Sequence, residues 1–207
     1  MSATANPVFT VGHSTHSWDG LLALVSLHGV TAVADVRSTP RSRFNPQFDR
    51  ESLADSLRQR GIAYVFLGRE LGGRPEDQSC YENGRVRYDL VARTALFQKG
   101  IDRVLHGAEE HRVVLLCAEK EPLECHRTLL VAAALVARGV VVQHIHADGR
   151  LERHEAAMDR LLDLVGLPRQ DLLHTKEELV AEALERQEQR VAYVRVEPAA
   201  DATGGTA

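Results

Sequence analysis

The residues whose chemistry is most informative lie in one short stretch, residues 113–128, which read VVLLCAEKEPLECHRT. An apolar run precedes a polar turn, so we expect a buried strand, then the turn, then a helix that begins near His126. The turn and the helix start contain Cys117, Glu119, Glu121, Glu124, Cys125, His126 and Arg127. Open α/β sheets carry their chemistry at the carboxyl ends of strands. The position of the turn therefore predicts a functional site.

Arg127 is the most suggestive single residue of this stretch, because a cation in the first turn of a helix opposes the macrodipole at a cost of roughly 0.3–1 kcal/mol. Two arrangements would offset that cost. Arg127 could form a structural ion pair with Asp35 or a nearby glutamate. Alternatively, Arg127 and the free N–H groups of the helix could hold a bound anion.

Further arginines favour the anion. Arg37, Arg41 and Arg43 follow a second expected strand and precede Phe44, a combination that suits a phosphate with a stacked base. A solvated basic loop balanced by nearby acids would show the same pattern. The expected anion-binding residues are Arg37, Arg41, Arg43, His126 and Arg127. Residues that could extend this rim are Arg69, Arg74, Arg85 and Arg87.

The catalytic candidates are Asp35, Glu119, His13 and Cys117. Asp35 lies in an otherwise apolar strand, so it either pairs locally to fix the arginine loop or serves as a general base or metal ligand. Cys117 stands where a strand meets a turn before a helix, a position that suits a thiol nucleophile. The glutamates of the turn disfavour a thiolate there, and a structural half-buried cysteine is the alternative. We expect Asp35 or Glu119 as the acid–base group, with His13 assisting.

A metal site is a further alternative. Cys117, Cys125 and His126, with Asp35 or His13, offer soft and borderline ligands for a transition metal. Their spacing matches no zinc finger or ribbon, in which C-x-x-C units are paired. The sequence itself requires no cofactor.

The remaining pattern alternates strands and helices, which predicts a three-layer α/β/α fold with a mainly parallel sheet of about five strands, plus a C-terminal helix. The expected strands span residues 8–14, 31–37, 62–67, 113–117 and 140–146. The expected helices span residues 17–28, 49–61, 88–110 with a break at Gly100, 127–138 and 151–165. Residues 68–86 form a long polar loop, which in a compact domain is usually functional.

The domain organisation follows from the same pattern. We expect a single α/β domain over residues 8–168 and a helical appendage over residues 169–197, whose helix begins with a capping box of Thr175 and Glu178. That helix either packs on the domain or contacts a second copy of the chain, which would make a homo-oligomer. Residues 198–207 are too polar to bury a core and are expected to be disordered.

Composition limits the classes of partner. The chain has 207 residues, 44% of them hydrophobic, and a net charge of −4, which argues against a broadly cationic nucleic-acid binder but allows a local basic patch. Three cysteines do not make a disulfide scaffold and suit a reducing compartment. Residues 1–7 lack the blocks of a signal peptide, and no apolar run is long enough to span a membrane. We expect a cytoplasmic protein with no membrane partner.

Five sequence blocks give the chain a family resemblance: VGHST at 11–15, ADVRSTPRSRFNPQF at 34–48, YVFLGRELGG at 64–73, LLCAEKEPLECHR at 115–127 and HIHADGRLERH at 144–154. On these blocks the chain resembles the domain-of-unknown-function 488 family of small bacterial proteins over residues 8–165. The resemblance implies a three-layer α/β/α fold and no particular activity. It also implies that the motif residues are His13, Asp35, Arg37, Cys117, Glu119, Cys125, His126 and Arg127.

The convergence of charged groups at one sheet edge leads to our main hypothesis. We expect an enzyme, a hydrolase or transferase, that acts on a phosphorylated small molecule, a nucleotide or a nucleic-acid end. One alternative is a non-catalytic sensor of a nucleotide or anion, or an interaction module. The other is a metal-dependent enzyme whose ligands are cysteine and histidine.

Overall fold

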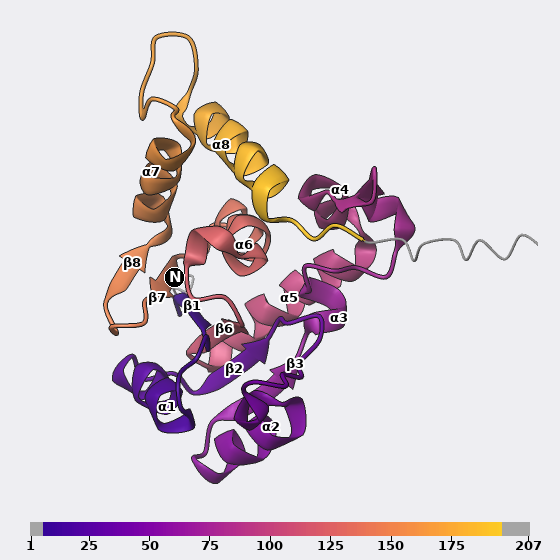
Figure 1. The fold of residues 1–207 in the computed structure, drawn as a ribbon. Coiled ribbons are helices and arrows are strands. Elements are labelled where there is room, and N and C mark those ends of the chain that lie inside the picture. Colours follow the sequence, from indigo (N-terminus) through magenta and orange to yellow (C-terminus); the bar gives the residue numbers. More distant parts are fainter. Residues whose placement is uncertain (1–5, 196–207) are drawn as a thin grey trace, which may run out of the picture.

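The fold is seen in a computed structural model that describes residues 6–195, so the tail expected at 198–207 lies outside the described residues. A six-stranded sheet has the order β3-β2-β6-β1-β7-β8 (Figure 1). Its strands are β1 (Val8–Gly12), β2 (Ala32–Asp35), β3 (Ala63–Phe66), β6 (Val113–Cys117), β7 (Val142–Ile145) and β8 (Leu151–Arg153). Every neighbouring pair is parallel except β7 with β8. The sheet and its helices confirm the predicted three-layer α/β/α fold.

Helices cover both faces of the sheet (Figure 1). They are α1 (Trp18–Leu27), α2 (Arg50–Gln59), α3 (Gly68–Leu71), α4 (Tyr88–Arg93), α5 (Ala95–Glu110), α6 (Ala133–Ala137), α7 (His154–Val165) and α8 (Lys176–Val191). Successive residues of a strand point to opposite faces, and β6 shows this plainly. Val114 and Leu116 pack with α1 and α2, whereas Leu115 and Cys117 pack with the core that the other helices bury.

Three local predictions were wrong. Residues 151–153 begin no helix but form β8, the sixth strand, whose exposed–buried–exposed pattern comes from pairing with β7. The helix expected over 88–110 breaks at Thr94 and not at Gly100. Thr94 caps α5 through its side chain. Gly100 instead allows close packing, since a Cβ there would lie 2.7 Å from the Leu71 side chain. The expected loop at 68–86 contains α3 and a hairpin of β4 (Tyr81–Glu82) and β5 (Arg85–Val86).

The C-terminal helix α8 packs on the domain. Its capping box of Thr175 and Glu178 is present as predicted, and its apolar face is buried at Leu179 and Ala183. Gln187 Nε2 donates a hydrogen bond to the Leu123 carbonyl at 2.9 Å, which ties α8 to the turn after β6. Of the two alternatives for this helix, the structure shows packing within the chain, and a homo-oligomer stays a prediction.

The segment after α8 returns to the hairpin. Val86 N donates to the Tyr193 carbonyl and Arg195 N to the Gly84 carbonyl. These bonds hold residues 193–195 beside β4 and β5. Among residues 6–195, no helix combines the length and the apolar character needed to cross a membrane.

Two histidines are buried between β7 and α7. His144 Nδ1 lies 2.8 Å from Thr10 Oγ1, and His144 Nε2 lies 3.2 Å from His154 Nδ1. Burial, together with the neighbouring His154, lowers the pKa of His144 to about 3. Burial lowers the pKa of His154 to about 4. Both rings are therefore neutral in the folded protein at neutral pH.

We expect acid to destabilise the fold well before the carboxylates titrate. An unfolded histidine takes up a proton below its ordinary pKa of 6.5, whereas folded His144 and His154 resist until near pH 3 and 4. The unfolded state then binds more protons, so the free energy of unfolding falls as the pH drops from 6.5 toward 4, by about 1.4 kcal/mol per unit of pKa shift. Urea unfolding across this range measures the slope.

The matched controls for this prediction are two single variants. His144→Gln removes one titrating ring and should flatten the slope, whereas His106→Gln, at an exposed position, should leave it unchanged. A slope that is the same in His144→Gln as in the wild type would contradict the assignment.

Candidate functional site

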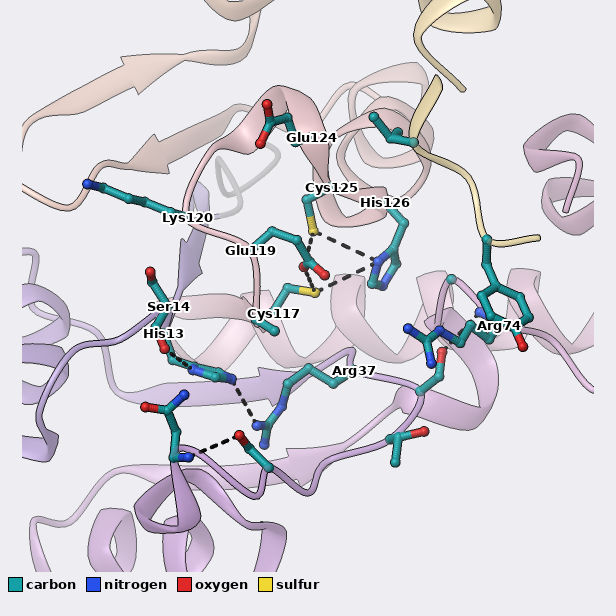
Figure 2. Close-up of a pocket in the computed structure, with 18 of the residues that line it drawn as sticks. His13, Ser14, Arg37, Arg74, Cys117, Glu119, Lys120, Glu124, Cys125 and His126 are labelled. Carbon is teal, nitrogen blue, oxygen red and sulfur yellow. Dashed lines mark hydrogen bonds between the residues drawn. The ribbon is translucent and has the colours of Figure 1, made fainter. Parts of the chain in front are cut away.

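A pocket of about 760 Å³ opens at the carboxyl ends of β1, β2 and β6 (Figure 2). These strands are neighbours in the sheet, with β6 between the other two, so segments far apart in sequence meet here. The lining residues are Tyr88 and a part of each of the segments 13–15, 37–45, 73–74, 117–126 and 191–193. The pocket lies at the sheet edge where the sequence placed it.

Four donor groups gather on the floor of this pocket: Cys117, Glu119, Cys125 and His126 (Figure 2). The Cys117 thiol donates to Glu119 Oε2 at 2.8 Å, and the Cys125 thiol donates to the same oxygen at 3.0 Å. His126 Nδ1 lies 3.8 Å from the sulfur of Cys117 and 3.9 Å from that of Cys125. Both cysteines are buried, and no disulfide joins them. The cluster combines two thiols, a carboxylate and an imidazole.

Gly12 allows the turn after β6 to form this cluster. Gly12 is paired with Cys117 in the sheet, and a Cβ at position 12 would lie 1.8 Å from the Glu119 carbonyl oxygen. No side chain fits in that space, so only glycine lets the turn cross the end of β1. Glu121 then shapes the turn by accepting a hydrogen bond from Leu123 N at 3.1 Å.

Arg127 holds the turn from below. Its side chain is 0% exposed, and its Nη1 and Nη2 donate to the carbonyls of Glu119 and Lys120 at 2.7 and 3.2 Å. Arg127 is absent from the pocket lining. The expectation that it binds an anion there, opposite Asp35, does not fit this placement. The turn folds over the helix start and occupies the guanidinium with carbonyl oxygens.

The helix that Arg127 begins is itself irregular. Residues Arg127–Ala132 form π-helical turns before α6, a feature that often accompanies functional sites. These turns bury six consecutive residues directly behind the cluster. At the start of this helix, Thr128 N and Leu129 N both donate to the Cys125 carbonyl.

Asp35 is 0% exposed and lies outside the pocket lining. Arg37 donates to it from Nε at 2.9 Å and from Nη2 at 2.6 Å, and the Tyr64 hydroxyl donates to it at 2.9 Å. Of the alternatives for Asp35, the structure shows the local ion pair with Arg37, which fixes the start of the loop that contains Arg41 and Arg43. No oxygen of Asp35 reaches the pocket as a base or a metal ligand.

His13 and Arg37 line the inner wall, but their polar atoms are occupied. His13 Nδ1 donates to the Ser14 carbonyl at 2.9 Å, so His13 Nε2 accepts from Arg37 Nη1 at 3.2 Å. Burial, and next to it the Arg37 cation, lower the pKa of His13 to about 4 despite the bond to Ser14. His13 therefore stays neutral and orients Arg37. Ser14 follows with a φ of 45°, a left-handed conformation uncommon outside glycine.

Besides Arg37, the lining includes Arg41, Arg74 and Lys120, and the Lys120 side chain extends away from the two cysteines (Figure 2). Arg43 is exposed and does not line the pocket. Lys120 was missed by the sequence analysis, although its place in the Cys117–Cys125 turn was a usable signal. Arg74, which the sequence only suggested as an extension of the rim, lies with its guanidinium 4.6 Å above the Tyr193 ring.

The thiols and the carboxylate of the cluster share their protons. Burial, then the neighbouring Cys125, raise the pKa of both Glu119 and Cys117. Burial also opposes ionisation of Cys125, while the Cys117 hydrogen bond and the Arg127 cation lower its pKa. Both sulfurs lie within hydrogen-bond distance of the same carboxylate oxygen, so ionisation of one group changes the pKa of the others. The choice of Cys117 as nucleophile stays a prediction.

Comparison with known proteins adds a family but no activity. No curated protein and no solved structure matches the chain. The family model of the domain of unknown function DUF488 matches residues 17–134, more than half of the chain. The match includes the turn with both cysteines, and it leaves His13 and the pocket residues near Tyr193 outside. The chain belongs to the DUF488 family.

Proposed function

We propose that the protein is an enzyme that binds a phosphorylated small molecule, a nucleotide or a nucleic-acid end in the pocket at the carboxyl edge of the sheet. The supporting observation is the charge of the lining. Arg41, Arg74 and Lys120 line one pocket from three separate segments, in a chain whose net charge is −4. The pocket volume of about 760 Å³ lies within the range of small-molecule sites.

Hydroxyl groups complete the anion-binding wall. Ser38, Thr39 and Ser42 line the same side as Arg41. Hydroxyl and guanidinium donors together satisfy the several oxygens of a phosphate, and charge-assisted hydrogen bonds are the strongest of this kind. Arg37 is part of the wall, but its guanidinium is neutralised by Asp35 at 2.6 Å, so we assign it a positioning role.

Glu119 is the acid–base group of the proposal. Its carboxylate lies on the pocket floor between two thiols at 2.8 and 3.0 Å. Its pKa is raised by the partial desolvation of the carboxylate and then by Cys125, although the residue as a whole is exposed, and the shift moves a carboxyl group toward the pH at which it exchanges protons efficiently. Placement of such a group inside the pocket favours a catalyst over a sensor that only binds.

Binding of phosphate compounds tests the proposal. We expect inorganic phosphate, pyrophosphate or a nucleotide to stabilise the wild type in a thermal-shift screen. We expect Arg41→Ala combined with Arg74→Ala to weaken binding of the best ligand by about tenfold or more, or about 1.4 kcal/mol, measured by titration calorimetry. Arg43→Ala is the matched control, because Arg43 is exposed in the same loop and outside the pocket.

Two results would overturn the proposal. One is that no phosphate compound stabilises the wild type. The other is that Arg43→Ala weakens binding as much as the double variant. Measurement of turnover distinguishes an enzyme from a non-catalytic sensor. If the protein is an enzyme, Glu119→Gln should still bind a phosphate ester but no longer convert it. Tight binding without conversion by the wild type would favour the sensor.

A further inference from the structure

Two sulfurs, one imidazole nitrogen and one carboxylate oxygen lie within 4.8 Å of one another on the pocket floor. We infer that Cys117, Cys125 and His126 bind a Zn²⁺ ion there, with Glu119 as an exchangeable fourth ligand. Thiolates with imidazole form the donor set that suits this ion. The ion shares the pocket of the proposed phosphorylated ligand, and its catalytic use, though not its binding, rests on the proposed function.

The distances within the cluster fit a tetrahedral ion. Zn–S bonds of about 2.3 Å and Zn–N or Zn–O bonds of about 2.0–2.1 Å place neighbouring donors about 3.4–3.8 Å apart. The separations between His126 Nδ1 and the two sulfurs are 3.8 and 3.9 Å. The separations from Glu119 Oε2 to the sulfurs are shorter, at 2.8 and 3.0 Å, because each thiol proton bridges to the carboxylate. Metal binding would release these protons and widen the gaps by about 0.5–0.8 Å.

His126 has the orientation that a metal ligand needs. Its Nε2 lies 3.0 Å from the Val36 carbonyl, which can only accept, so Nε2 carries the proton. The lone pair of Nδ1 then faces the two sulfurs. Histidines that ligate metals usually donate their other N–H to a carbonyl or carboxylate in this way. Gly73 packs closely against the imidazole ring, and a larger residue would collide with it, since a Cβ at position 73 would lie 2.9 Å from His126 Cγ.

Charge balance supports the same site. Arg127 is fully buried behind the cluster, and within residues 6–195 it forms no ion pair with a carboxylate. Its Nε also finds no hydrogen-bond partner. A Zn²⁺ ion with two thiolates and one carboxylate carries one net negative charge, which the Arg127 cation balances. A buried arginine without such a counter-charge would be costly.

The openness of the site indicates what the ion would do. All four donors line the pocket, whereas structural zinc sites are closed by four fixed ligands. Three fixed ligands and a carboxylate that can exchange leave one position for a water or a phosphate oxygen. A Zn²⁺ ion held by these ligands would supply Lewis acidity.

Metal analysis and cobalt substitution test the inference. Untagged protein, purified in a reducing buffer without chelators, should contain about one Zn²⁺ per chain by mass spectrometry. Replacement by Co²⁺ should produce the intense ligand-field bands of a tetrahedral site and a sulfur-to-cobalt charge-transfer band. Zn²⁺ should also protect two thiols from a disulfide reagent, and a chelator should expose them again.

Variants identify the ligands. Cys117→Ser, Cys125→Ser and His126→Asn should each lower Co²⁺ affinity by more than the roughly 100-fold that losing a ligand's supporting partner costs. Cys80→Ala is the matched control, because Cys80 is buried in the core outside the pocket, and its Co²⁺ spectrum should equal that of the wild type. The thiol-protection measurement uses the wild type alone, so it decides the question even where a variant fails to fold.

Three outcomes would overturn the inference. The first is reduced wild-type protein that binds no Co²⁺. The second is Co²⁺ binding without a sulfur band or without thiol protection, and the third is full retention of the spectrum in Cys117→Ser. Arg41→Ala with Arg74→Ala should leave the Co²⁺ spectrum intact. A wild-type protein that gives the normal Co²⁺ spectrum but binds no phosphate compound would therefore refute the proposed function alone. A wild-type protein that binds phosphate compounds but takes up no Co²⁺ would refute the metal site alone.

Discussion

Replacement of Asp35 by alanine is expected to lower the free energy of unfolding by about 3–5 kcal/mol. The carboxylate is fully buried and accepts two hydrogen bonds from the Arg37 side chain and one from Tyr64. Its removal leaves the Arg37 cation, which is 4% exposed, without its counter-ion. Urea unfolding followed by circular dichroism measures the loss.

A double variant distinguishes a structural ion pair between Asp35 and Arg37 from a role of Asp35 in the reaction. Asp35→Ala with Arg37→Met removes both charges, and it should recover a large part of the stability lost in Asp35→Ala, because no buried charge is left unpaired. An Asp35→Ala protein that is as stable as the wild type but inactive would show that Asp35 takes part in the reaction. The structural role assigned here would then be wrong.

Replacement of Arg127 by methionine is expected to lower the free energy of unfolding by about 3 kcal/mol or more, since it removes two charge-assisted hydrogen bonds. These bonds, at 2.7 and 3.2 Å, hold the carbonyls of Glu119 and Lys120 over the end of β1. The turn carries the donor cluster, so the same variant should also weaken Co²⁺ binding. Chemical unfolding and the cobalt spectrum give the two readouts.

Arg127→Lys is the graded control. A lysine keeps the positive charge but cannot donate to both carbonyls from a planar fork. We expect its stability and Co²⁺ affinity to lie between those of the wild type and Arg127→Met. Arg127→Met with wild-type stability would contradict the assignment of this residue as the support of the turn.

Much of the fold could be predicted because regular elements repeat their hydrophobic pattern. Residues Val113–Cys117 form a buried strand between the residues expected, and the alternation of strands with helices implied the parallel sheet. The strand β8 was missed for a physical reason. Three residues contain too little periodicity to mark a strand, and its existence depends on pairing with β7, which lies before it in the chain.

Prediction of the site was less complete, because turns lack a repeating pattern. Cys117, Glu119 and His126 line the pocket at the predicted edge. Tyr193 lines the same pocket from the opposite end of the chain, and nothing in its local sequence marks it. Its place follows from the packing of α8 and from the hydrogen bond between Val86 and Tyr193.

The sequence by itself determined that thiols, a carboxylate and an imidazole lie at one sheet edge, because parallel strands joined by helices bring their carboxyl ends together. Only the tertiary structure decided which side chains face the pocket. Gly12 lets the turn cross β1, Arg127 is thereby enclosed beneath it, and His126 points its free nitrogen at the sulfurs. The direction of a side chain in an irregular turn depends on contacts with distant segments, and local sequence does not contain them.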